Sequence, residues 1–266
     1  MDEETRKPDE PQPQPAWQIT PTRKVTWDCI DCLVIEDQEL IDLRDRGENP
    51  DKYWAEGWTL TLGQVRRSDF NVDQDGRYHR VYPARYWINK LKITKSMRRV
   101  LARNSDLKIV TRPLRITPGK ENLYLAFHLN RFGCAPREPL NKRYQYIVYH
   151  PARLMETCCF LDEELIAFSI FEVGDYSIWS NLGVWSQAHA ARSLGTLTIL
   201  KEIEYARAHG LMHYYLGHYN PRDARYLYKS RFRPLELYDW DNQRWIGFDA
   251  PRTAQMLREP LRRRGD

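Results

Sequence analysis

The clearest hydrophobic pattern in this 266-residue chain lies in its C-terminal half. Apolar residues recur there at Leu197, Leu200, Ile203 and Ala206. Residues three or four apart share one face of a helix, so this spacing predicts a helix with one apolar side. Gly210 stands just beyond it, where a left-handed residue commonly ends a helix. The pattern therefore predicts a helix that begins beside Arg192 and ends before Gly210.

Other segments have patterns that extend this picture to a mixed fold. Residues 118–132 begin with proline and have apolar positions typical of a helix. Residues 165–173 and 176–184 are strand-like runs on either side of a Gly-Asp turn, which predicts a hairpin. A short aromatic strand is expected at residues 212–216, after the helix. The fold class predicted is α+β.

Composition restricts the protein to a globular class. Apolar residues make up 42% of the chain, and no run approaches the roughly 18 apolar residues of a spanning helix. The acidic, proline-rich start is unlike a signal peptide. We therefore expect a cytoplasmic protein without a membrane partner. Residues 1–16 are expected to be a disordered tail, and residues 251–266 a basic one.

Charge is distributed unevenly along the chain. The net charge is +5, but residues 1–57 contain 7 Lys and Arg against 15 Asp and Glu. The rest of the chain is therefore strongly basic, which suits a nucleic-acid partner. A mildly basic soluble protein with no such partner is the alternative.

The most concentrated positive charge lies between Lys90 and Arg103, which contains six cations and no acid. Thr94 or Ser96 could cap a helix here, with Lys95, Arg99 and Arg103 on one face and Arg98 beside them. The cations are Lys90, Lys92, Lys95, Arg98, Arg99 and Arg103. Such a ridge can follow a phosphate backbone, although a solvated basic surface has the same composition.

The five cysteines form no complete metal-binding pattern. Cys29 and Cys32 make one C-x-x-C pair, and a zinc or iron–sulfur site needs a second pair. Cys158 and Cys159 lie in an apolar run and are expected in the core. The odd count also argues against a disulfide framework. We predict that the protein needs no metal and no cofactor.

Two short segments have residues suited to negatively charged ligands. Arg192-Ser193-Leu194-Gly195-Thr196 precedes the predicted helix, whose free N–H groups and dipole favour an anion. A basic and aromatic run, Arg225 to Arg233, follows further on. On a strand, Lys229 and Arg231 would share one face. Both segments could equally be an ordinary amphipathic helix and a solvated surface.

The amino-acid sequence of this region resembles that of a known family. The phrases RSLGTLTILKEIEYARAHGL, YYLGHY and YKSRFRPLEL, with a closing Trp, are similar to the C-terminal half of the aminoacyl-tRNA–protein transferases. These include eukaryotic arginyl-transferases and bacterial leucyl-transferases, and the bacterial branch is the more similar. The resemblance is loose over residues 58–103 and good over residues 150–245.

The resemblance implies a GNAT-like acyltransferase fold with an N-terminal α/β extension. It divides the chain into an N-terminal family domain, residues 17–110, and a transferase domain, residues 111–250. The implied activity transfers an amino acid, with leucine favoured and arginine possible, from aminoacyl-tRNA to an N-terminal Asp or Glu. That transfer marks the acceptor protein for degradation by the N-degron route. The implied partners are aminoacyl-tRNA and proteins with acidic N-termini.

The same resemblance suggests roles for individual residues. Glu172 lies near an acid of the family's strand and is a candidate base, and Tyr228 is a second candidate catalytic residue. Lys229 and Arg231 would bind the acceptor's carboxylate. The tRNA and its aminoacyl end would be bound by Arg98, Arg99, Arg192, Ser193 and Gly195.

Differences from the family's sequence motifs leave two other functions possible. His218 and residues 220–225 differ from the usual family sequence, and residues 80–88 lack the expected cysteines. An acyl-CoA N-acetyltransferase would have a second small residue in its glycine turn, where this chain has Leu197. A non-catalytic tRNA-binding relative is the other alternative.

Overall fold

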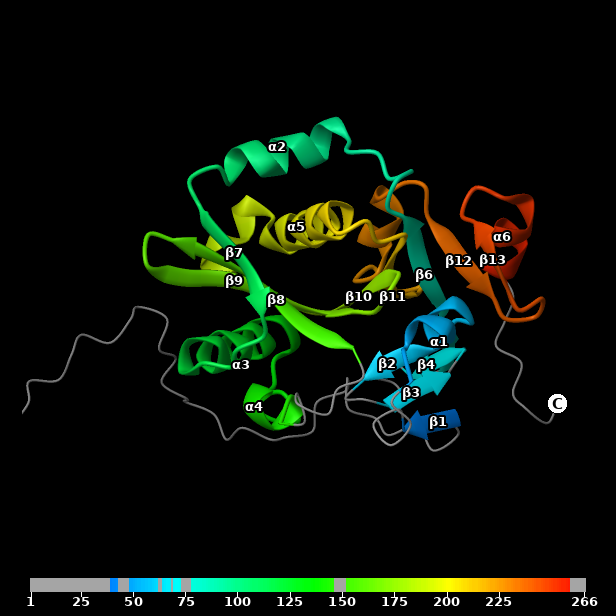
Figure 1. Ribbon diagram of the computed structural model, residues 1–266, viewed down its shortest axis with the longest axis horizontal. Helices are drawn as coiled ribbons and strands as arrows, with labels where there is room; N and C mark the ends of the chain where they lie inside the picture. The colour runs from blue at the N-terminus through cyan, green and yellow to red at the C-terminus, as the bar shows by residue number, and fades with distance from the viewer. Residues whose placement is uncertain are drawn as a thin grey trace, which may run out of the picture.

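An eight-stranded sheet forms the centre of the computed structural model, which describes residues 39–42, 48–61, 64–67, 69–72, 78–145 and 152–258. The strand order is β13-β12-β6-β11-β10-β9-β8-β7 (Figure 1). Only β10 and β11 pair in parallel, and the other neighbours pair antiparallel. The strands are β6 (Tyr82–Trp87), β7 (Lys108–Pro113), β8 (Arg153–Leu161), β9 (Glu164–Val173), β10 (Ser177–Trp185), β11 (His213–Tyr219), β12 (Glu236–Asp239) and β13 (Arg244–Gly247).

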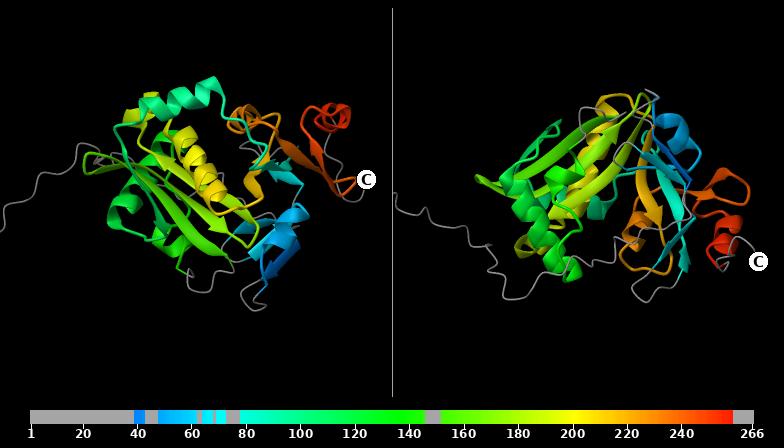
Figure 2. Two further views of the ribbon diagram at one scale, coloured as in Figure 1. Left: turned by 45° about the horizontal axis from the view of Figure 1, so that its top comes forward. Right: turned by 90° about the horizontal axis from the view of Figure 1, so that it is seen from below.

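Helices cover both faces of this sheet. α5 (Leu194–Ala208) connects the two parallel strands and lies on one face of the sheet. α2 (Lys95–Arg103) packs against it (Figures 1 and 2). α3 (Pro118–Phe132) and the short α4 (Leu140–Arg143) lie against the other face. Side chains of β9 alternate between the two faces of the sheet. Phe168 therefore packs in the cluster under α3, and Phe171 packs in the cluster under α5.

The N-terminal strands form two small sheets beside the large one. Their order is β1-β3-β2 in the first, with β4 paired to β5 in the second. The elements are β1 (Glu39–Asp42), α1 (Asp51–Ala55), β2 (Thr59–Thr61), β3 (Gln64–Arg67), β4 (Phe70–Val72) and β5 (Tyr78–Arg80). α1 joins this part to the large sheet, because the fully buried Trp54 stacks near Trp179 and Tyr215.

The α+β class is confirmed, and the main helices lie where the sequence predicts them. Thr94 caps α2, and Met97 N–H donates to its hydroxyl. α5 begins after Ser193, and Gly210 adopts a left-handed φ of 68° just beyond its end. The order of hairpin, helix and strand predicted for residues 165–216 is also the observed one. α6 (Pro251–Met256) forms within the expected basic tail.

The N-terminal half differs from its sequence pattern in one element and also contributes strands to the large sheet. Residues 39–47 have a helix-like pattern that ends at a glycine, but Glu39–Asp42 is strand β1, paired antiparallel with β3. Backbone pairing to a distant strand overrides the local pattern here. The expected domain boundary at residue 110 falls inside β7, and β6 inserts between β11 and β12. The large sheet therefore takes strands from both sides of that boundary.

The described residues contain buried thiols and no membrane-spanning helix. Cys158 and Cys159 are fully buried in β8 and free. Cys134 is disulfide-bonded, contrary to the inference drawn from the odd cysteine count. Cys29 and Cys32 lie outside the described residues, as does the expected disordered tail. Within the described ranges, no helix is long and apolar enough to cross a bilayer.

Candidate active site

A cavity of about 540 Å³ opens where the two parallel strands part. β10 and β11 share only three paired positions, and the register of β10 shifts between Ser180 and Leu182 just beyond them. The cavity is lined by Ser180, Gly183 and Trp185 of β10, Leu216 of β11, Arg131 and Phe132 of α3, Ala190 and Ser193 before α5, residues 194–196, 198, 199 and 202 of α5, and residues 224–226, 228 and 229.

The first turn of α5 forms one wall of the cavity. Ser193 precedes the helix in a left-handed conformation, with φ 57° and ψ 45°. A side chain at Gly195 would bring its Cβ within 3.0 Å of the Trp185 ring, so glycine allows close packing there. Because a helix start presents N–H groups and a positive dipole end, this wall favours a negative group. Ser193 and Gly195 therefore lie in the cavity, as the sequence analysis requires of ligand-binding residues.

Glu202 lines the same cavity and is the residue that the sequence analysis missed. It is fully buried, and Tyr214 donates its hydroxyl to Oε2 at 2.6 Å. Burial raises the pKa of Glu202 to about 7, although nearby hydroxyls of Ser169 and Ser180 partly favour the charged form. The sequence does contain a signal for it. Glu202 is an acid on the same side of the helix as Thr198 and Ile199, and this side lies next to the apolar stripe.

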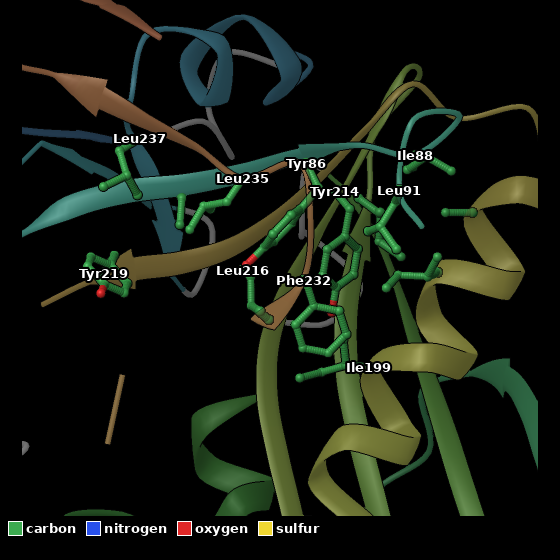
Figure 3. Packing of buried hydrophobic residues seen from close by; sticks show 14 of the residues in the cluster. Tyr86, Ile88, Leu91, Ile199, Tyr214, Leu216, Tyr219, Phe232, Leu235 and Leu237 are labelled. Carbon is green, nitrogen blue, oxygen red and sulfur yellow. The ribbon is translucent and has the colours of Figure 1, made fainter. Parts of the chain in front are cut away.

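Lys229 is held in the cavity wall by the short 3₁₀ helix η4 (Leu227–Arg231). Phe232 and Tyr86 fix this helix to the sheet core (Figure 3), and the Tyr86 hydroxyl donates to the Lys229 carbonyl at 2.7 Å. The Lys229 ammonium donates to the His218 carbonyl and lies 5.0 Å from the Tyr226 ring centre. Burial lowers the pKa of Lys229 to about 7.

The expectation that Lys229 and Arg231 share a face is wrong. That expectation assumed a strand, whereas the segment is a 3₁₀ helix, in which residues two apart point in different directions. Lys229 is 5% exposed, while Arg231 is exposed and does not line the cavity. Tyr228 does line the cavity, and burial raises the pKa of its hydroxyl.

Glu172 is buried on the opposite side of the sheet from Glu202. Asn181 donates its amide to Oε1 at 2.6 Å and accepts the Tyr144 hydroxyl at 2.8 Å. Burial raises the pKa of Glu172 to about 8. Glu172 is therefore a buried acid, but it does not line the cavity.

The predicted cationic residues outside the cavity lie beside its helical wall. Arg192 makes a bidentate salt bridge to Asp106, with both N–O distances 2.9 Å. The Asn104 side chain at the end of α2 donates to the Arg192 carbonyl at 2.9 Å. Arg98 and Arg99 are exposed on α2. The basic ridge of α2 is thus tied directly to the start of α5, although neither it nor Arg192 lines the cavity.

The lowered pKa of Lys229 predicts that the stability of the fold depends on pH. Its ordinary pKa is 10.5, so the unfolded chain holds this proton over a range where the folded protein releases it. The penalty for burying the charge is complete below pH 7 and disappears as pH rises toward 10.5. Wild type should therefore gain stability over Lys229→Met between pH 7 and 10. Urea unfolding of both proteins measures this, and a difference independent of pH would contradict the buried charge.

Comparisons with known proteins identify similar chains. Residues 119–239 match the family model described as "Arginine-tRNA-protein transferase, C terminus". An aspartate/glutamate leucyltransferase of Stenotrophomonas maltophilia (strain R551-3) is 31% identical over 168 residues, which cover 58% of this chain and 64% of the relative. One from Xanthomonas axonopodis pv. citri (strain 306) is 28% identical over 176 residues, covering 63% and 69%. The resemblance noted in the sequence is confirmed. The chain spans slightly less than two thirds of the Stenotrophomonas relative.

Among solved structures, a tandem GNAT protein from the clavulanic acid biosynthesis pathway is similar to this chain at a TM-score of 0.41. The two are 14% identical, and the match covers 62% of this chain and 51% of that one.

Proposed function

We propose, because residues 119–239 match the arginine-tRNA–protein transferase C-terminal family, that this protein is an aminoacyltransferase. It moves an amino acid from aminoacyl-tRNA to the α-amine of a protein whose first residue is Asp or Glu. Leucine is the favoured donor, in line with the names of the relatives, and arginine is the other candidate. In the cell this transfer would mark the acceptor protein for degradation.

The cavity, which combines a helix start with the buried Lys229, supports this proposal. The reaction joins the acceptor's nitrogen to the ester carbonyl carbon and breaks the bond from that carbon to the tRNA ribose oxygen. The amine loses a proton and the ribose oxygen gains one. Negative charge develops on the carbonyl oxygen, and N–H groups at the start of α5 are suited to stabilise it.

Little base catalysis is needed for this chemistry. A free α-amine has a pKa of about 7.7–8.0, so roughly a tenth or more is neutral at pH 7. The ester is already activated, and orientation provides much of the rate. Tyr228 lies in the cavity wall and is a candidate for such orientation. Glu172 lies behind the sheet, so its role as a base would have to be indirect.

Lys229 is suited to hold the acceptor's side-chain carboxylate. Its ammonium is buried, and among the described residues no negative charge offsets the desolvation, so its pKa falls to about 7. A carboxylate entering the cavity would favour the charged form and raise that pKa. The acceptor would thus form a charge-assisted hydrogen bond inside the cavity.

A direct assay separates this proposal from its alternatives. Peptides that begin with Asp or Glu are incubated with the protein and several charged tRNAs, and then with acetyl-CoA instead. Mass gain by one amino acid residue supports the proposal, while gain of an acetyl group would identify an N-acetyltransferase. No mass gain, together with retained tRNA binding, would identify a non-catalytic relative.

The basic ridge of α2 is expected to provide part of the tRNA affinity. Arg98→Ala combined with Arg99→Ala should weaken tRNA binding, because each removed phosphate contact abolishes the release of counterions. The slope of log K against log salt should become shallower by about 1 to 2. Arg244→Ala, at an exposed site on β13, is the matched control. Filter binding at several salt concentrations measures both quantities, and an unchanged slope in the double variant would exclude a role for the ridge.

A further inference from the structure

The cavity wall contains the buried carboxylate of Glu202, and only one of its two oxygens accepts a hydrogen bond from the described residues. Oε2 of Glu202 accepts the Tyr214 hydroxyl, but Oε1 has no hydrogen-bond partner in the part of the chain that the structure describes. Glu202 is fully buried, and it lines the cavity beside Thr198 and Ile199. A buried polar atom without a partner costs folding free energy, and more so when it carries charge. Such an atom in a cavity wall indicates that the ligand supplies the missing donor.

We propose, building on the aminoacyl transfer above, that Glu202 receives a positively charged nitrogen of the donor's aminoacyl group. The helix start and Glu202 lie on the same helix, with Gly195 seven residues before the acid. At 1.5 Å per residue this is a separation of about 10 Å. The 3′ end of an aminoacyl-tRNA could lie along this wall, with a phosphate or the ester oxygen at the helix start and the amino group at Glu202.

The donor fits Glu202 better than the acceptor does. The donor's own carboxyl is esterified, so its aminoacyl group carries only positive charge, which a buried anion can neutralise. The acceptor amine must instead reach the ester uncharged. A carboxylate beside it would stabilise the ammonium form and raise its pKa, which opposes attack. Glu202 and Lys229 would therefore sort the two substrates, the acid holding the donor and the lysine holding the acceptor.

Two nitrogens could supply this positive charge. Every aminoacyl-tRNA has an α-ammonium, and an arginyl donor also has a guanidinium on its side chain. Apolar side chains of Leu194, Ile199 and Leu216 also line the cavity. These suit the side chain of leucine or the methylene stem of arginine equally. Burial raises the pKa of Glu202 to about 7, which agrees with an acid that awaits a cation.

Binding of unreactive donor analogues tests the proposal independently of activity. The probes are amides of 3′-amino-3′-deoxyadenosine that carry leucine, arginine or N-acetyl-leucine, titrated calorimetrically into the full chain. Wild type should bind the leucyl amide more tightly than the N-acetyl-leucyl amide. Glu202→Gln should weaken binding of a charged probe about tenfold and leave the N-acetyl-leucyl amide unchanged. Glu204→Gln, an exposed acid on the same helix that pairs with Lys201, is the control.

The pattern across probes identifies the nitrogen. Equal weakening of the leucyl and arginyl amides by Glu202→Gln would assign the α-ammonium, and weakening of the arginyl amide alone would assign the guanidinium. Unchanged binding of every probe, equal weakening of all three, or a loss confined to the KM of the acceptor peptide would overturn the proposal. If the variant does not fold, wild type still decides, because equal affinity for charged and acetylated leucyl probes and no preference for arginine would refute it. The mass-gain assay judges the aminoacyl transfer separately.

Discussion

Replacing Lys229 by methionine is expected to lower kcat/KM for a peptide with N-terminal aspartate by about ten- to a hundredfold. The methionine side chain fills nearly the same space in the cavity wall but cannot pair with a carboxylate. Lys229 is 5% exposed and its ammonium is buried in the cavity wall, so water replaces that contact poorly. The measurement is steady-state transfer to the peptide, with the dissociation constant for tRNA measured alongside.

Arg231 provides the matched control for this experiment. It lies two residues from Lys229 on the same 3₁₀ helix but is exposed and outside the cavity. Arg231→Met should therefore change peptide kinetics by less than about threefold, as expected for an exposed charge. The assignment of the carboxylate to Lys229 fails if both variants lose activity equally, or if tRNA affinity falls in step with activity in Lys229→Met.

Replacing Glu156 by alanine is expected to destabilise the fold by about 3–5 kcal/mol. The Glu156 carboxylate, on strand β8, is fully buried and bonds to residues of strand β7 and helix α3. It accepts hydrogen bonds from the ammonium of Lys120, which is 1% exposed, and from Nε of Arg112 at 2.8 Å. Without the carboxylate, the Lys120 charge stays in the core with no counter-ion. Urea unfolding of the two proteins measures the difference.

The exposed pair Lys201–Glu204 gives the reference for this result. Its N–O distance of 2.7 Å is ordinary for an ion pair, but the Glu204 side chain is 67% exposed. Glu204→Ala should cost less than about 1 kcal/mol. Combining Glu156→Leu with Lys120→Met should recover much of the loss from Glu156→Ala, because no buried charge then lacks a partner. A double variant as unstable as Glu156→Ala would show that the loss comes from packing instead of charge.

Local signals in the sequence were sufficient to place the main helices. Thr94, Thr117 and Gly210 each stand at a helix end with the geometry that capping requires, so α2, α3 and α5 begin and end near the predicted residues. The order of strands in the sheet has no such local signal. β1 shows the difference, because its identity depends on pairing with β3 about 25 residues later.

The candidate site was predictable only where one short segment defines it. The start of α5, with Ser193 and Gly195, lies in the cavity as expected. Glu202 was not found, because its burial depends on β9, β10 and β11 packing over the helix. The sequence assigns Arg192 to tRNA binding and has no local signal for its salt bridge to Asp106, which lies in a distant turn. In each case the deciding partner lies far along the chain.

The position of β6 in the sheet has a consequence for synthesis of the protein. β6 is made early but pairs with β11 and β12, which lie more than 120 residues later. During translation β6 cannot form its pairings with β11 and β12 until most of the chain has left the ribosome. Contacts of such long sequence separation slow folding and leave strand edges exposed to aggregation. A nascent chain stalled before residue 213 would therefore be a stronger client for chaperones than the same chain released at full length.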